Sequence, residues 1–102
     1  MTTTLCTVEF LVKLGNTVVQ GAVCKAKLLG VNQASDDGIL SNRESSDTTD
    51  ALGEAELSLV QKGQFIKGQG LYEIWVEISG KPVASARTTI PNQATVQFED
   101  LL

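Results

Sequence analysis

Hydrophobic and polar residues alternate with a period of two along most of the chain. From Cys6 to Leu14 every even position is apolar, whereas the odd positions include Glu9 and Lys13. The stretch Leu71–Ser79 repeats this alternation. A period of two is typical of a β-strand that turns one face to the core and the other to solvent. We therefore predict that both stretches are half-buried strands.

Shorter stretches continue the alternation to the end of the chain. They are residues 18–29 with a break at Gly21, 55–59, 83–90 and 94–98, separated by residues that favour turns. In total the pattern indicates about seven strands spaced about 8–12 residues apart, and no helical period of convincing length. The sequence thus predicts an all-β chain that folds as one domain, residues 1–102, in an antiparallel β-sandwich.

One long segment, residues 30–46, interrupts the alternation. It is rich in Asn, Ser, Asp and Gly, and Ile39 and Leu40 form its apolar pair. We expect a long loop, with a short hairpin tipped at Asp37-Gly38. Loops of this length in a small domain usually serve a function or are ordered by a partner. Ile39 and Leu40 are therefore candidate partner contacts.

Five acidic residues gather in and just after this segment: Asp36, Asp37, Glu44, Asp47 and Asp50. Clustered carboxylates could bind Ca²⁺, a hard cation that prefers oxygen ligands. Their spacing matches no EF-hand loop, however, and Asp-Gly and Ser-Asp pairs are common in turns. We favour solvated turns, and we expect neither a metal nor a cofactor.

Composition narrows the classes of function. The chain has 8 Lys and Arg against 12 Asp and Glu, a net charge of −4, which argues against a nucleic-acid binder. It has no histidine, so it lacks the usual general base and the commonest metal ligand. The start Met1–Thr4 has no signal-peptide pattern, and no stretch is long enough to span a membrane. We expect a non-enzymatic protein that is made in the cytoplasm and does not contact membranes.

The two cysteines, Cys6 and Cys24, both fall on the apolar side of their predicted strands. We favour buried free thiols that behave as small hydrophobic residues. A disulfide between them stays open at this stage, because a hairpin centred near Gly15-Asn16 would set them almost opposite each other.

The only tryptophan, Trp75, falls on the polar face of its predicted strand, between Glu73 and Glu77. Its ring either lies flat over neighbouring strands or anchors an interface, where a large amphipathic ring provides much contact area. The two glutamates would lie about 13 Å apart along the strand, which is wide for a glycosidase pair. We assign Trp75, Glu73 and Glu77 as candidate partner contacts.

The chain ends in Leu101-Leu102, directly after two acidic residues. This apolar pair either tucks against the domain or serves as a hook for a neighbouring subunit. We add Leu101 and Leu102 to the candidate partner contacts.

Four segments, in order, carry a resemblance to a known family. They read Leu-Gly-Asn-Thr-Val-Val-Gln-Gly-Ala-Val-Cys over residues 14–24, Thr-Thr-Asp-Ala-Leu-Gly-Glu-Ala-Glu-Leu over 48–57, Gly-Leu-Tyr-Glu-Ile-Trp-Val over 70–76 and Ser-Gly-Lys-Pro over 79–82. Together they resemble the carboxypeptidase-regulatory-like, or prealbumin-like, β-sandwich, an Ig-like architecture. Enzymes of that superfamily use histidines and a C-terminal Tyr-Arg-Gly-Ser, and this chain has neither. The resemblance therefore implies the fold and not their hydrolase activity.

The end of the chain carries a second resemblance. The run Thr89–Ala94, followed by Phe98–Leu102, is similar to the tails of small Ig-like or prealbumin-like structural proteins of tailed bacteriophages. This similarity implies a virion component, most plausibly a capsid decoration or cement protein that binds other capsid or tail subunits as a homo-oligomer. Two rival hypotheses stay open: an adhesion or carbohydrate-binding module with Trp75 as its platform and, more remotely, a small hydrolase.

Overall fold

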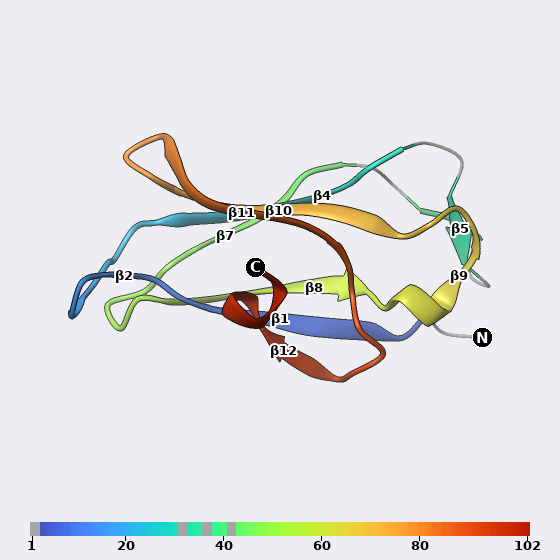
Figure 1. Cartoon of the computed structure of the whole chain (residues 1–102), viewed down its shortest axis with the longest axis horizontal. Coiled ribbons are helices and arrows are strands. Elements are labelled where there is room, and N and C mark those ends of the chain that lie inside the picture. Colours follow the sequence, from blue (N-terminus) through green and yellow to red (C-terminus); the bar gives the residue numbers. More distant parts are fainter. Residues whose placement is uncertain (1–2, 31–32, 36–37, 41–42) are drawn as a thin grey trace.

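The computed structural model describes residues 3–30, 33–35, 38–40 and 43–102. The chain is mostly β-structure, and its strands form several sheets (Figure 1). The first main sheet has the order β12-β1-β8, with β12 parallel to β1 and β8 antiparallel to it. Its strands are β1 (Leu5–Leu11), β8 (Glu54–Val60) and β12 (Thr95–Gln97).

The second main sheet is antiparallel throughout, in the order β11-β10-β4-β7. Its strands are β4 (Val23–Leu28), β7 (Ser45–Thr48), β10 (Leu71–Ile78) and β11 (Lys81–Thr89). A bulge interrupts the pairing of β10 with β11 beside their connecting turn, between Val76 and Glu77. The two main sheets lie in two layers, one above the other in Figure 1.

Smaller elements close the two ends of the molecule. A two-stranded ribbon, β2 (Lys13–Leu14) and β3 (Thr17–Val18), lies at one end, and a three-stranded sheet lies at the other. That sheet comprises β5 (Ala34–Ser35), β6 (Gly38–Ile39) and β9 (Phe65–Lys67). Two short 3-10 turns, η1 (Lys62–Gln64) and η2 (Phe98–Leu101), are the helical elements of the described residues, and neither has the length to cross a membrane.

The core lies between the two layers and follows the alternation of the sequence. Even positions of β1 and β4, such as Val8 and Leu28, are almost fully buried, as is Ile74 of β10. Their odd neighbours face outwards, because successive side chains of a strand point to opposite faces. The Tyr72 hydroxyl accepts a 3.3 Å hydrogen bond from the Val60 backbone N–H, so a polar contact also connects the two layers.

A turn at residues 49–53 carries the chain from β7 in one layer to β8 in the other. The buried Thr49 side chain accepts a hydrogen bond from the Ala22 N–H and donates one to the Val19 carbonyl. The Asp50 side chain accepts hydrogen bonds from the backbone N–H groups of Leu52, within the turn, and of Glu54, at the start of β8. Gly53 has a φ of +77°, and a side chain there would collide with the Val12 carbonyl. The Thr-Thr-Asp-x-x-Gly pattern of the sequence is therefore a structural requirement of this crossing.

The structure corrects two expectations and confirms a third. Residues 30–46 are not a single loop, because they contain β5 and β6, which form the expected short hairpin, and they lead into β7. The tip of that hairpin lies outside the described residues. Leu14 is exposed and not in the core, because β1 ends at Leu11 and the chain turns into the β2–β3 ribbon. The favoured prediction for the cysteines is confirmed: Cys6 and Cys24 are buried free thiols, and they lie in opposite layers and not across a hairpin.

Candidate functional site

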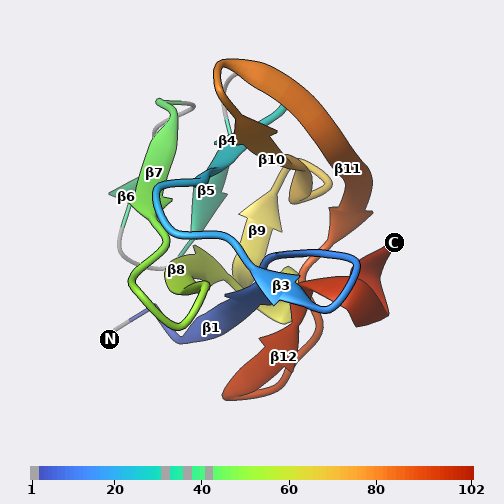
Figure 2. The same ribbon diagram turned by 90° about the vertical axis from the view of Figure 1, so that its left-hand side faces the viewer.

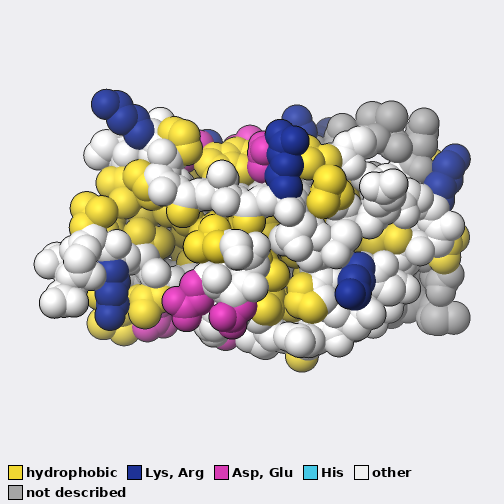
Figure 3. All heavy atoms as spheres, viewed as in Figure 1, with side chains coloured by type: hydrophobic (Ala, Val, Ile, Leu, Met, Phe, Trp, Pro, Cys, Tyr) yellow, Lys and Arg dark blue, Asp and Glu magenta, His cyan; other side chains and the backbone are white. Residues whose placement is uncertain are grey.

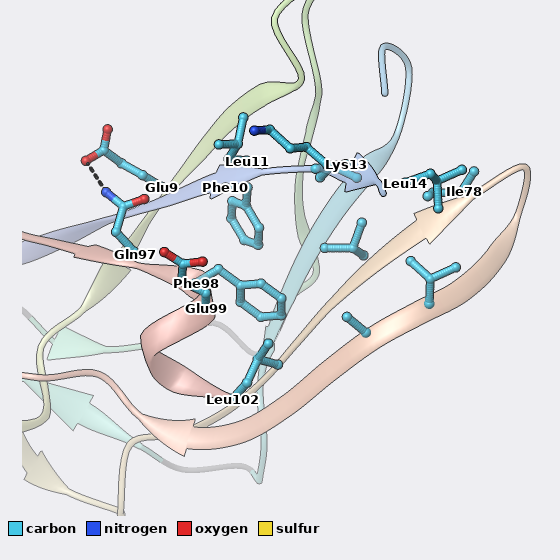
Figure 4. A pocket seen from close by; sticks show the side chains of 14 residues that line it. Glu9, Phe10, Leu11, Lys13, Leu14, Ile78, Gln97, Phe98, Glu99 and Leu102 are labelled. Atoms are coloured by element: carbon cyan, nitrogen blue, oxygen red, sulfur yellow. Dashed lines mark hydrogen bonds between the residues drawn. The ribbon is translucent and has the colours of Figure 1, made fainter. Parts of the chain in front are cut away.

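An apolar groove opens between the two layers on the side where β11 and η2 lie. It has a volume of about 310 Å³, which is at the lower end of the range for ligand pockets. The end of β1, the β10–β11 hairpin and η2 form its walls, and Figure 4 shows the side chains that line it. Phe10 and Phe98 lie at its base, with ring centroids 4.9 Å apart.

The groove exists because the chain crosses between the layers at different ends on the two sides. On the side of β7 and β8, the crossing turn 49–53 lies at the end of the molecule that carries β2 (Figure 1). On the other side the chain leaves β11 through the fully buried Ile90 and crosses nearer to the end that carries β5 and β9 (Figure 1). The β10–β11 hairpin therefore has no crossing segment beneath it, and the short turn η2 fills only part of the gap.

Four large apolar side chains with high exposure surround the groove. Leu11, Leu14, Val83 and Leu102 all line it, and each is between 54% and 67% exposed. A single exposed leucine is ordinary on a soluble protein, but a contiguous group around a hollow marks an interaction site. Figure 3 shows hydrophobic side chains gathered around a hollow in the left half of that face.

Charged side chains also line the groove. Glu9 and Glu99 lie on the side of β1 and η2, and Lys13 lies at the start of β2. Glu9 accepts a 3.1 Å hydrogen bond from the side-chain amide of Gln97. None of the three charged groups forms an ion pair with another described residue. The groove thus has an apolar base, and its rim carries both exposed apolar side chains and charges of both signs.

The predicted site around Trp75 lies on a different surface, the outer face of the second main sheet. Trp75 pairs with Lys25 on one side and with Ser85 on the other. Its indole N–H donates a 2.6 Å hydrogen bond to the Glu77 carboxylate, and its ring is half-buried. This arrangement fits the interpretation in which the ring lies over neighbouring strands.

Ion pairs hold the charged groups next to Trp75. The Lys25 ammonium lies 3.3 Å from Glu77 and 3.4 Å from Glu44, and the Arg87 guanidinium lies 2.9 Å from Glu73. The hydrogen bond from Trp75 is the main reason why the pKa of Glu77 is lowered; partial burial opposes it, and Lys25 lowers it further. Hydrogen bonding to Glu77 is likewise the main cause that raises the pKa of Lys25. The two glutamates thus sit in separate ion pairs, on either side of the ring.

The remaining predicted contacts are scattered. Ile39 lies in β6 at the far end from the groove and is almost fully exposed, whereas the adjacent Leu40 is half-buried and packs against the core. Leu101 is also half-buried against the core, and Leu102 reaches the rim of the groove. The structure thus splits each apolar pair into one packed and one exposed residue, and it brings only Leu102 to the groove.

Three residues of the predicted acidic cluster, Glu44, Asp47 and Asp50, act as hydrogen-bond acceptors or ion-pair partners. Asp47 accepts bonds from the Thr48 and Glu56 backbone N–H groups, at 3.0 and 2.9 Å. Asp50 stabilises the crossing turn, and Glu44 pairs with Lys25. Within the described part of the chain, no three His, Cys, Asp or Glu side chains come together as a metal site. Asp36 and Asp37 lie outside the described residues.

Both thiols are buried, which suppresses their reactivity as nucleophiles. Burial raises the pKa of Cys6, and it raises the pKa of Cys24 to about 12, with the charge of Asp47 adding to the rise. The thiolate is the reactive form of cysteine, and these pKa values keep both side chains protonated at neutral pH.

Sequence reasoning missed three of the four rim residues. Leu11 is an apolar residue at an odd position of β1, like Leu5 at its start, and this break in the alternation was a usable signal. Leu14 continued the apolar even positions, so its pattern pointed to the core. Val83 follows a proline at the start of a strand, and nothing in its local sequence separates an exposed from a buried position.

Comparison with known proteins adds no relative to this picture. No family model, curated protein or solved structure matches the chain.

Proposed function

We propose that this chain is a non-catalytic structural protein of a tailed-phage virion, and that it binds a neighbouring virion subunit through the apolar groove. A capsid decoration or cement protein is the most specific form of this proposal. The supporting observation is the group of four exposed apolar side chains around one hollow. The virion setting rests on the resemblance of the chain's tail to phage structural proteins, and it implies synthesis in the host cytoplasm.

The fold supports the same proposal. The three strands of the first main sheet and the four of the second would correspond to the seven strands of a prealbumin-like, Ig-like sandwich. The motifs that carry the resemblance occupy the β2–β3 ribbon, the crossing turn, β10 and the β10–β11 turn. These are structural positions, so the resemblance bears on architecture and leaves the binding surface to be argued from the groove.

A binding role also fits the state of the reactive groups. Glu73 and Glu77 are held by separate cations, and the thiols are buried and protonated. We do not extend the proposal to a sugar-binding platform at Trp75, because its ring is half-buried and its N–H is already donated to Glu77.

The test compares rim variants on purified particles. We expect Leu14→Ser and Val83→Ser to change the free energy of unfolding by about 0.5 kcal/mol or less, because both side chains are exposed. Each variant should nevertheless occupy particles at least about tenfold more weakly, as expected when a buried interface contact is lost. Leu52→Ser is the matched control, because Leu52 is 64% exposed and does not line the groove.

Mass spectrometry of the particles measures the copy number of each form. Absence of the wild-type chain from particles would remove the virion setting. Wild-type occupancy by the double variant Leu14→Ser with Val83→Ser would remove the groove as the binding surface.

A further inference from the structure

Strand β11 forms a long free edge of the second main sheet. It is nine residues long and pairs on one side with β10 only. Within the described residues, no backbone group of 83–86 bonds to any strand other than β10. A strand edge of this kind presents unpaired N–H and C=O groups that can pair with another strand. Figure 2 shows β11 at the side of the molecule where no further strand covers it.

The other edges of the two main sheets are short or closed. Strand β12 has three residues. Strands β7 and β8 lie next to each other, and Asp47 of β7 accepts a 2.9 Å hydrogen bond from the Glu56 N–H of β8. Natural proteins protect long edges with Pro, Lys and bulges. In β11 these devices stand at its start, in Lys81, Pro82 and the bulge, and they leave the middle of the strand unprotected.

The middle of β11 is complementary to itself. Residues 83–86 read Val-Ala-Ser-Ala, so they are small or uncharged. In an antiparallel pair of two copies centred on Ser85, Ala84 of one copy would face Ala86 of the other. Each charged residue of the strand would face an uncharged one: Arg87 would face Val83, and Lys81 would face Thr89. This pairing therefore brings no like charges directly opposite each other, an arrangement that destabilises strand pairs.

We infer that two copies of this chain associate through β11, which joins their second main sheets into one continuous eight-stranded sheet around a twofold axis at Ser85. Such an isologous contact uses the same surface on both copies. Ser85 is exposed on the outer face of the sheet, in the same row as Trp75, and it does not line the groove. Val83 and Ala84 of the paired segment do line the groove, so the variants that test the pairing are placed at Ser85 alone.

The first test is sedimentation of the purified chain from about 10 µM to about 1 mM, the range of a weak association. We expect the weight-average mass to rise with concentration from 10.9 kDa towards twice that value. Ser85→Lys should weaken the association at least about tenfold, because it sets two lysines opposite each other. Ser58→Lys is the matched control: Ser58 is an exposed serine of β8, the edge strand that lies next to β7, and its variant should associate like wild type.

Cross-linking gives a second readout of the same contact. Residues directly opposite in an antiparallel pair have Cα atoms about 4.5–5.5 Å apart, within the range of a disulfide. Ser85→Cys should therefore oxidise to a covalent dimer much faster than Ser58→Cys, while the buried Cys6 and Cys24 remain reduced. Circular dichroism shows whether each variant keeps the wild-type fold.

Three results would each overturn the inference. They are a wild-type chain that stays monomeric at the highest concentration, a dimer that Ser85→Lys does not weaken, and cross-linking at Ser85→Cys no faster than at Ser58→Cys. Cross-linking of Ser85→Cys to a different particle protein, with no dimer formed, would assign the edge to a strand of that protein. None of these results affects the comparison of Leu14→Ser with Leu52→Ser, which tests the proposed function.

Discussion

The two sides on which the sheet edges meet are built in different ways. On the closed side, β7 and β8 lie next to each other, and the Asp47 carboxylate bonds to the β8 backbone. On the open side, no hydrogen bond joins β11 to β12 among the described residues, and the turn η2 lies in the gap with Phe98 as its buried residue. Figure 2 shows the closed side at the left and the open side at the right.

The two sides differ in how they satisfy the backbone hydrogen-bonding groups and how they cover the apolar side chains at the sheet edges. The closed side pairs polar backbone with a carboxylate, so little is left for another molecule. The open side covers its apolar base with the short turn η2, whose Phe98 stacks on Phe10, and it leaves four large apolar side chains exposed and the edge of the nine-residue strand β11 unpaired. Unsatisfied backbone edges and contiguous exposed apolar groups are the features that partners recognise. The comparison therefore assigns stability to one side and binding to the other.

The largest loss of stability is expected from a mutation on the open side, Phe98→Ala. Phe98→Ala removes a buried ring that stacks on Phe10 and holds η2 over the core. Truncation of a buried Phe typically costs about 3–5 kcal/mol, so we expect a loss of stability of this size in urea unfolding. Phe98→Leu is the control and should cost much less, because it keeps an apolar side chain at the base. A cost below about 1 kcal/mol for Phe98→Ala would show that the groove base is not part of the core.

A smaller loss of stability is expected from a mutation on the closed side, Asp47→Asn. In Asp47→Asn only one acceptor oxygen remains for two backbone N–H groups, those of Thr48 and Glu56. Hydrogen bonds to charged groups contribute about 1.5–3 kcal/mol each, and we expect a loss of about 1–3 kcal/mol in urea unfolding because the site is partly exposed. Glu56→Gln keeps the same backbone N–H and serves as the control. Equal stability of Asp47→Asn and wild type would mean that β7 and β8 are held together by other contacts.

The sequence predicts which residues face the core between the two layers better than it predicts how the sheet edges are covered on the two sides. Alternation correctly identified the inward faces of β1, β4 and β10, because each pairs centrally and has one face in the core. It also placed Cys6 and Cys24 in the core. It did not separate β1 from β2, so it assigned Leu14 to the core, although the chain turns after Leu11.

The candidate site could be predicted only in part, for a physical reason. Periodicity reports which face of a strand a residue occupies, whereas the groove depends on which strands meet and where the chain crosses between layers. Leu102 was identified because it is an apolar residue beside acids, but Val83 has no such signal. Trp75 was correctly placed on the outer face, and only the structure shows that its N–H is bonded to Glu77.

A pH-dependent effect sharpens the comparison through Cys24, a titrating group that lies next to the closed side. Burial raises the pKa of Cys24 to about 12, and the charge of Asp47 adds to the rise, because Asp47 pairs with Cys24 across β7 and β4. In the unfolded chain this thiol ionises near its ordinary pKa of about 8.5. The unfolded state therefore binds fewer protons than the native state between about pH 9 and pH 12, and the free energy of unfolding falls as pH rises through that window.

One such thiol contributes a slope of at most about 1.4 kcal/mol per pH unit. The measurement is urea unfolding at several pH values from neutral to alkaline. Cys6 and Tyr72 have raised pKa values as well and add slope of the same sign, so the test is the difference between wild type and Cys24→Ala. We expect the variant to lose stability less steeply with pH. Asp47→Asn should lie between the two, because it removes the lesser cause of the shift and keeps the burial; equal slopes for all three proteins would contradict the placement of Cys24 beneath the closed side.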